Sequence, residues 1–130
     1  MLNRLAALAL LFAAPLVAQN IPASLPPLSI AQQTSLRCSA AFAMVSAGQA
    51  GGEAESLAFP PLAKRGREYF VRAAARLMDE TGATREHLQA LMLREATAIR
   101  AEGPKSLSAL MPPCLMLLDL EVPLAAHPAR

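Results

Sequence analysis

Residues 28–50 read LSIAQQTSLRCSAAFAMVSAGQA, and Arg37 is the only charged residue among them. A surface helix carries polar and charged side chains along its outer face, so a helix with almost no charge has to be covered on most sides. The segment also carries Cys38, one of only two cysteines in the chain. We therefore expect it to form the central helix of a small helical domain, with the rest of the chain packed around it.

Both ends of this helix are marked by capping residues. Ser29 stands three residues before Gln32, which is the spacing of a capping box, in which each side chain bonds the backbone N–H of the other residue. Glycine commonly follows the end of a helix, and glycines occupy positions 48, 51 and 52. The sequence therefore predicts a helix from Ile30 to Gly48. Its predicted stripe comprises Thr34, Cys38, Ala41, Phe42 and Val45.

Length and charge narrow the class of protein. The 130 residues allow one domain. The net charge is +2, from 12 basic and 10 acidic residues, and this is too little for the basic stripe of a nucleic-acid-binding surface. We therefore expect no nucleic-acid partner.

The first 18 residues have the features of a secretory signal. Arg4 supplies a positive charge, residues 5–18 form an uncharged apolar run, and the small side chain of Ala18 suits the position before a cleavage site. The apolar run of about 14 residues is shorter than the roughly 20 that a membrane-spanning helix needs. We expect export to the periplasm or secretion, with a mature chain that begins near Gln19 and keeps no stable membrane span.

Prolines and glycines divide the mature chain. Residues 19–28 contain three prolines and should form an extended lead-in. A helical domain is expected over residues 29–121 and a flexible tail over residues 122–130. Within the domain, the pattern predicts a helix from Pro61 to Thr81 and another that is capped by Thr84 and ends before the Gly-Pro pair at 103–104. Gly66 predicts a close approach of a neighbouring helix.

Two prolines interrupt the last apolar segment. Because proline is expected to break a helix, we predict a short helical turn over residues 105–111, a break at Pro112 and Pro113, and a short helix over residues 114–120. The fold class predicted from the whole pattern is all-α, a compact bundle of four or five helices around a central N-terminal helix.

The two cysteines are the strongest candidates for a defined chemical role. In an oxidising compartment a lone pair of cysteines tends to form a disulfide, and a Cys38–Cys114 bond would close a loop of about 77 residues, worth at most about 4 kcal/mol in the chain-entropy model. The alternative is a reactive thiol, because Cys114 follows two prolines at a predicted helix N-terminus, where a thiol pKa is lowered.

No other residues form a catalytic or metal-binding pattern. His87 and His127 are the only histidines and lack zinc-site spacing; we interpret His87 as a surface residue near a helix cap. Methionines at helical spacing are interpreted as core residues. On the helix from residue 61, arginines and acids alternate, so we interpret this row as a solvated face instead of an anion site. The row comprises Arg65, Glu68, Arg72, Arg76 and Asp79.

Three segments carry a resemblance to known proteins: RCSAAF at 37–42, PLAKRGREYF at 61–70 and PCL at 113–115. In these the chain resembles small exported two-cysteine helical proteins of unknown function from GC-rich Gram-negative bacteria, and the resemblance implies no activity. Acid-stress periplasmic chaperones are similar in having one disulfide between helices, although the cysteine spacing here is wider. Periplasmic immunity proteins of secreted toxins are similar in a cysteine-bearing first helix and a late Pro-Cys, but they usually carry further cysteines.

These observations lead to one functional hypothesis and two alternatives. The chain is expected to be a non-enzymatic binding or protective module that acts on another periplasmic or envelope protein, without a metal, cofactor or catalytic residue. The alternatives are a thiol-redox protein that uses Cys114, and an exported enzyme with an unrecognised site.

Overall fold

The computed structural model describes residues 24–124. The predicted signal at residues 1–18, the start of the lead-in and residues 125–130 of the predicted tail lie outside this range. Within it the chain forms five helices and no strand, which confirms the all-α prediction. None of these helices is both long and apolar enough to cross a membrane.

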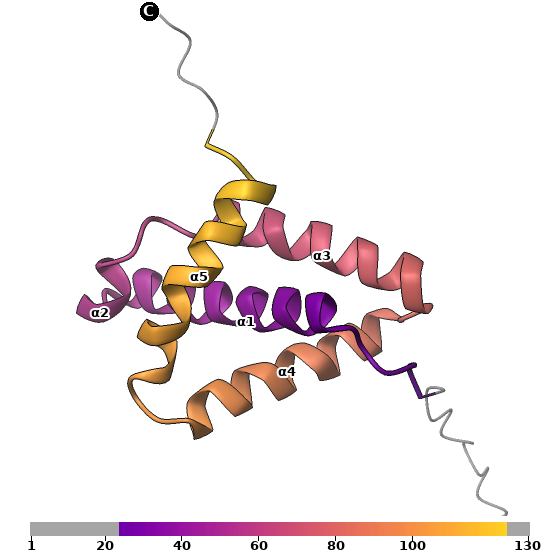
Figure 1. Cartoon of the computed structure of the whole chain (residues 1–130). Coiled ribbons are helices and arrows are strands. Elements are labelled where there is room, and N and C mark those ends of the chain that lie inside the picture. Colours follow the sequence, from indigo (N-terminus) through magenta and orange to yellow (C-terminus); the bar gives the residue numbers. More distant parts are fainter. Residues whose placement is uncertain (1–23, 125–130) are drawn as a thin grey trace, which may run out of the picture.

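The helices surround one central element. In chain order they are α1 (Ile30–Gly51), α2 (Ala54–Leu57), α3 (Arg65–Thr81), α4 (Arg85–Ala101) and α5 (Ser106–Glu121). Helix α1 contacts each of the other four, as predicted for the N-terminal helix. Figure 1 shows α3 and α4 diverging from their short connection along two sides of α1, while α5 crosses α1.

Helix α1 starts as predicted but runs further. The capping box is present: Ser29 Oγ accepts from the Gln32 N–H at 3.2 Å, and Gln32 Oε1 accepts from the Ser29 N–H at 2.8 Å. The predicted end at Gly48 is wrong, because the helix continues to Gly51 and is capped by Gly52 with φ 76°. A Cβ on Gly48 would lie 2.1 Å from the Ser56 Oγ of α2, so this glycine makes room for a neighbour instead of ending the helix.

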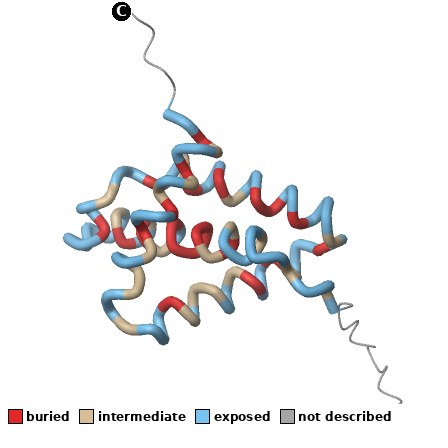
Figure 2. The backbone as a smooth tube through the Cα atoms, in the orientation of Figure 1, coloured by how far each residue is buried: buried red, intermediate tan, exposed pale blue. Residues whose placement is uncertain are grey.

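The core lies along the middle of α1, where Figure 2 shows an almost unbroken run of buried residues. Of the predicted stripe, only Thr34 is exposed, because it lies in the first turns before α1 enters the bundle. The Phe42 ring packs edge-on against Tyr69 of α3, with ring centres 5.2 Å apart. The buried members of the stripe are Cys38, Ala41, Phe42 and Val45.

Helix α3 begins at Arg65 and not at Pro61 as predicted. The Leu62 N–H donates to Gln49 Oε1 at 3.1 Å, and Leu62 is buried. The amide nitrogen of Gln49 also donates to three carbonyls of the loop before α3. One side chain of α1 thus fixes the path of this segment, which includes the short helix α2 that was not predicted. The predicted close approach at Gly66 is confirmed, because a Cβ there would lie 3.0 Å from the Cβ of Phe42.

Helix α4 begins and ends close to its predicted bounds. Thr84 Oγ1 accepts from the His87 N–H at 3.3 Å, and His87 Nδ1 accepts from the Thr84 N–H at 3.1 Å. His87 therefore completes a capping box in the place that glutamate or glutamine usually takes. The inward stripe includes buried Leu88, Leu91 and Ile99.

The predicted break at Pro112 and Pro113 is wrong, because α5 continues through both prolines. Each proline removes the N–H that would bond the carbonyl four residues earlier. Those carbonyls belong to Ser108 and Ala109, which are both exposed, so water can replace the missing donors. Packing of α5 against the rest of the bundle then supports the helix on both sides of the prolines.

The disulfide joins α5 to the centre of the bundle. Cys38 and Cys114 are bonded, with Cα atoms 5.3 Å apart and a sequence separation of 76. Their exposed fractions are 2% and 0%. Cys114 lies inside α5 and not at a helix N-terminus, so the position that suggested a lowered thiol pKa is absent. Val122, placed in the predicted tail, is buried and belongs to the packed domain.

Candidate functional site

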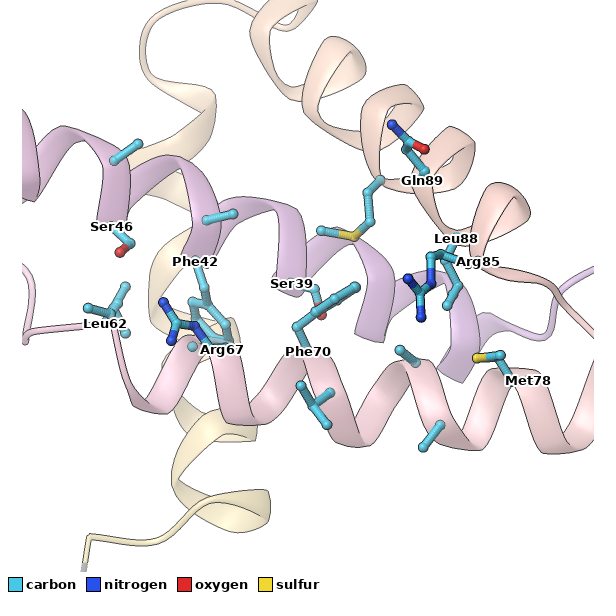
Figure 3. A pocket seen from close by; sticks show the side chains of 18 of the residues that line it. Ser39, Phe42, Ser46, Leu62, Arg67, Phe70, Met78, Arg85, Leu88 and Gln89 are labelled. Atoms are coloured by element: carbon cyan, nitrogen blue, oxygen red, sulfur yellow. The ribbon is translucent and has the colours of Figure 1, made fainter.

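The other three long helices, α3, α4 and α5, leave one side of α1 open. Helical spacing places Ala43, Ala47 and Ala50 on the side of α1 opposite Cys38 and Val45, which face α5. The three alanines are exposed. Figure 3 views this side, with α3 in front of α1, α4 beyond it and α5 behind both.

A groove of about 1090 Å³ lies along this open side between α1, α3 and α4. Its walls include Phe70, Val71 and Met78 from α3 and Leu88 and Met92 from α4. The side chains that α1 contributes are small except for one ring: Ser39, Phe42, Ala43, Ser46, Ala47 and Ala50. A groove of this size with mostly apolar walls is typical of a binding site.

The groove has charge of one sign only. Arg67 and Arg85 are its only charged lining residues, and both are exposed. Within residues 24–124, neither guanidinium makes a hydrogen bond or an ion pair. Glu86 stays outside the groove lining; its pKa is lowered first by its own backbone N–H, then by the Thr84 side chain, and less by Arg85. The groove therefore presents two cations that are not bonded to an acid among residues 24–124.

The arginines on the opposite side of α3 are engaged. Arg65 donates to the Val122 carbonyl at 2.7 and 3.1 Å and to the Asp119 carboxylate at 2.6 Å. Its side chain is only 17% exposed. Arg72 donates to the Glu121 carbonyl at 2.6 Å. The prediction of a purely solvated row is wrong here, because the end of α5 supplies acceptors that the sequence of α3 does not reveal.

The remaining members of that row are more exposed. Arg76 donates to the Glu121 carboxylate at 2.6 Å, and the Arg72 and Arg76 side chains are 49% and 50% exposed. Glu68 pairs with Arg72 one turn away. Together with Arg65, these arginines hold the carbonyl end of α5, where positive charge is favourable.

The single charge of α1 is also neutralised inside the fold. The Arg37 guanidinium donates to both carboxylate oxygens of Glu102 at 2.6 Å and lies 3.8 Å from Glu95. Both acids lie at the C-terminal half or end of α4. Arg37 therefore fastens α4 to α1 and is not available at the groove.

A second, smaller cavity of about 350 Å³ lies on the α5 side, with Ser35, Arg76 and Glu121 in its lining. The buried Tyr69 hydroxyl lies near these three residues but makes no hydrogen bond of ordinary geometry. Burial raises the pKa of Tyr69, and the nearby Ser35 side chain opposes that rise.

The predicted disulfide residues come together, whereas the histidines do not form a site. His87 serves the cap of α4, and His127 lies beyond the described range. Among residues 24–124, no three side chains of His, Cys, Asp or Glu are grouped to hold a metal ion. The groove was missed at the sequence level, although its signal is present: α1 carries a single charge, Arg37, and has apolar side chains on more sides than its neighbours cover.

Comparison with known proteins gives no relative: no family model, no curated protein and no solved structure matches this chain.

Proposed function

We propose that this chain is an exported, non-enzymatic binding module that holds an apolar segment of another envelope protein in the groove between α1, α3 and α4. Residues 1–18, with Arg4 before an apolar run, support export through a cleaved signal. The buried Cys38–Cys114 disulfide supports the same conclusion, since such bonds persist in oxidising compartments.

The observation that carries the proposal is an open apolar groove with two exposed arginines, Arg67 and Arg85, that make no hydrogen bond or ion pair within residues 24–124. A groove of this volume with mostly apolar walls and a few polar groups is typical of a binding site. The lining side chains are mainly Ala, Leu, Met, Val and Phe, which supply contact area and no nucleophile or general base. A protein that covers an apolar segment of its partner also shields that segment from water, which would make the binding protective.

Site-specific photo-crosslinking in the cells that produce the protein tests this function. A photo-reactive amino acid replaces Ala47 in the groove or, as a matched control, Ala90, which is exposed on α4 and does not line the groove. We expect a discrete protein adduct from position 47 and none from position 90. No adduct at position 47, or equal adducts at both positions, contradicts the proposal.

Export is tested on the same preparation by intact mass. We expect a mature chain that begins near Gln19. A mass that still includes residues 1–18 contradicts cleavage of the signal.

A further inference from the structure

We infer that the groove binds an amphipathic helix that carries two acidic side chains about three turns apart, one for Arg67 and one for Arg85. This inference rests on the proposed function and specifies the partner. Its three supports are the separation of the two arginines, the small side chains that α1 presents, and the way in which α5 is bound on the other side of the same helices.

The two arginines lie towards opposite ends of the groove. Arg67 is in the first turn of α3, and Arg85 is the first residue of α4, directly after the connection that follows Thr81. The 14 positions from Arg67 to Thr81 span about 21 Å along a helix. Figure 3 shows both side chains at the groove, with Phe70 and Ser39 between them. We take about three turns of helix, roughly 16 Å, as the spacing of the two anionic groups in a ligand that reaches both arginines, a value within that span.

The α1 side of the groove suits a helix. Ala43, Ala47 and Ala50 have no atoms beyond Cβ, and the distance between packed helices depends on the side chains at their contact. The contact of Gly66 with Phe42 shows that α1 already accepts a closely packed helix beside this groove. An apolar helix face in such a groove is a common mode of peptide recognition.

Helix α5 is bound within the molecule by the same combination of apolar contacts and arginine–acid pairs. Its only charged residues are Asp119 and Glu121, and they bind Arg65 and Arg76 of α3. The rest of α5 packs through apolar side chains against α1. On the groove side, α3 and α4 again present cations beside an apolar surface, so an acid-bearing apolar helix is complementary there too.

A fatty acid is less complementary to this arrangement. It has one carboxylate, and an acyl chain that places it on one arginine leaves the other without an anion. A second copy of this chain is disfavoured as well, because a symmetric contact would bring Arg67 and Arg85 of both copies together unless other acids intervened.

Two designed peptides test the inference on the purified mature protein by fluorescence anisotropy. Each is a labelled helix of about 18 residues with an Ala/Leu face and two glutamates 11 positions apart, about 16 Å, or lysines at the same two positions. We expect the wild type to prefer the glutamate peptide by at least about tenfold, since like charges at an interface are strongly disfavoured. The Arg67→Glu/Arg85→Glu variant should reverse the preference. The matched Arg100→Glu variant changes an exposed arginine that does not line the groove, and it should keep the wild-type preference.

The outcomes separate this inference from the proposed function. Melting curves test whether the variants fold. We expect them to fold, because both groove arginines are exposed and make no hydrogen bond or ion pair within the described residues. Equal binding of the two peptides, or binding of neither, overturns the acid-bearing helix while an adduct at position 47 leaves the proposed function intact. Stronger binding of hexadecanoate than of the glutamate peptide, or an adduct from position 47 to a second copy, also overturns it. Absence of the adduct at position 47 in the protein that keeps both arginines contradicts the proposed function itself.

Discussion

Helix α3 presents arginines on two sides, and the two sides differ in what they bind. On the α5 side, Arg65, Arg72 and Arg76 each reach an acceptor of the same chain. On the groove side, Arg67 has none within the described residues. The same residue type therefore has two uses. Where the fold supplies the acceptor, arginine contributes to stability; where it does not, the guanidinium is open to solvent and, in our proposal, to an acid of a bound partner.

This comparison separates changes that affect folding from changes that affect binding. Substitutions on the α5 side should lower the free energy of unfolding in proportion to how buried the lost contacts are. Substitutions of the groove arginines should leave it almost unchanged.

The largest effect is expected from the disulfide that fixes α5. Cys114→Ser removes the constraint on the unfolded chain and leaves Cys38 as a buried thiol. We expect a loss of about 2–4 kcal/mol, and a similar loss on reduction of the wild type. Thermal melts of the oxidised wild type, the reduced wild type and the variant measure it. If all three melt at the same temperature, the disulfide does not stabilise the fold, and the thiol-redox alternative becomes the preferred hypothesis.

Arg65→Gln should have the next largest effect. The change removes three hydrogen bonds to the end of α5 from a largely buried side chain. We expect a loss of about 1–2 kcal/mol, since the Val122 carbonyl loses its donor while Val122 remains buried. Urea denaturation measures this loss. Arg67→Gln is the matched control, because Arg67 makes no hydrogen bond or ion pair within the described residues. Equal stability of the two variants would show that Arg65 does not hold α5.

Tyr69→Phe should act in the opposite direction, because it removes a buried hydroxyl that makes no hydrogen bond of ordinary geometry within residues 24–124. We expect a gain of up to about 1 kcal/mol at neutral pH. The raised pKa means that the folded protein holds this proton more tightly than the unfolded chain. The wild type should therefore lose stability relative to the variant only as the pH rises above the ordinary tyrosine value of about 10. Denaturation at pH 7 and pH 10.5 tests both points, and a loss at pH 7 would indicate that the hydroxyl is bonded.

The smallest effects on the α5 side are expected for Arg72→Gln and Arg76→Gln. Both side chains are half exposed, so water replaces much of the lost interaction. We expect each change to cost less than about 0.5 kcal/mol. Chemical denaturation of the two single variants measures this cost. A loss as large as that of Arg65→Gln would show that the exposed fraction of an arginine side chain does not predict how much its contacts contribute to stability.

The parts of the fold that local sequence controls were predictable. The capping residues Ser29 and Thr84, the buried stripe through Cys38 and the end of a helix at Thr81 depend on residues within a few positions of one another. The disulfide was predicted from the presence of two cysteines together with a predicted export signal. In each case a short-range rule decides the structure without knowledge of distant contacts.

The features that depend on distant contacts were not predictable. The prolines of α5 are tolerated because packing supports the helix around them, and the role of Arg65 depends on acceptors more than 50 positions away. Gly48 was interpreted as a helix end, although its function is to admit Ser56. The groove itself exists only because α3 and α4 diverge along α1, which no local pattern specifies.

The central claim is that the groove arginines serve binding and not folding. It is tested most directly with the Arg67→Gln/Arg85→Gln variant carrying the photo-reactive amino acid at position 47. The account predicts a melting temperature within about 3 °C of the protein with both arginines, together with a loss of the position-47 adduct by at least about tenfold. An unchanged adduct yield, or a melting temperature lowered as far as in Arg65→Gln, would contradict it.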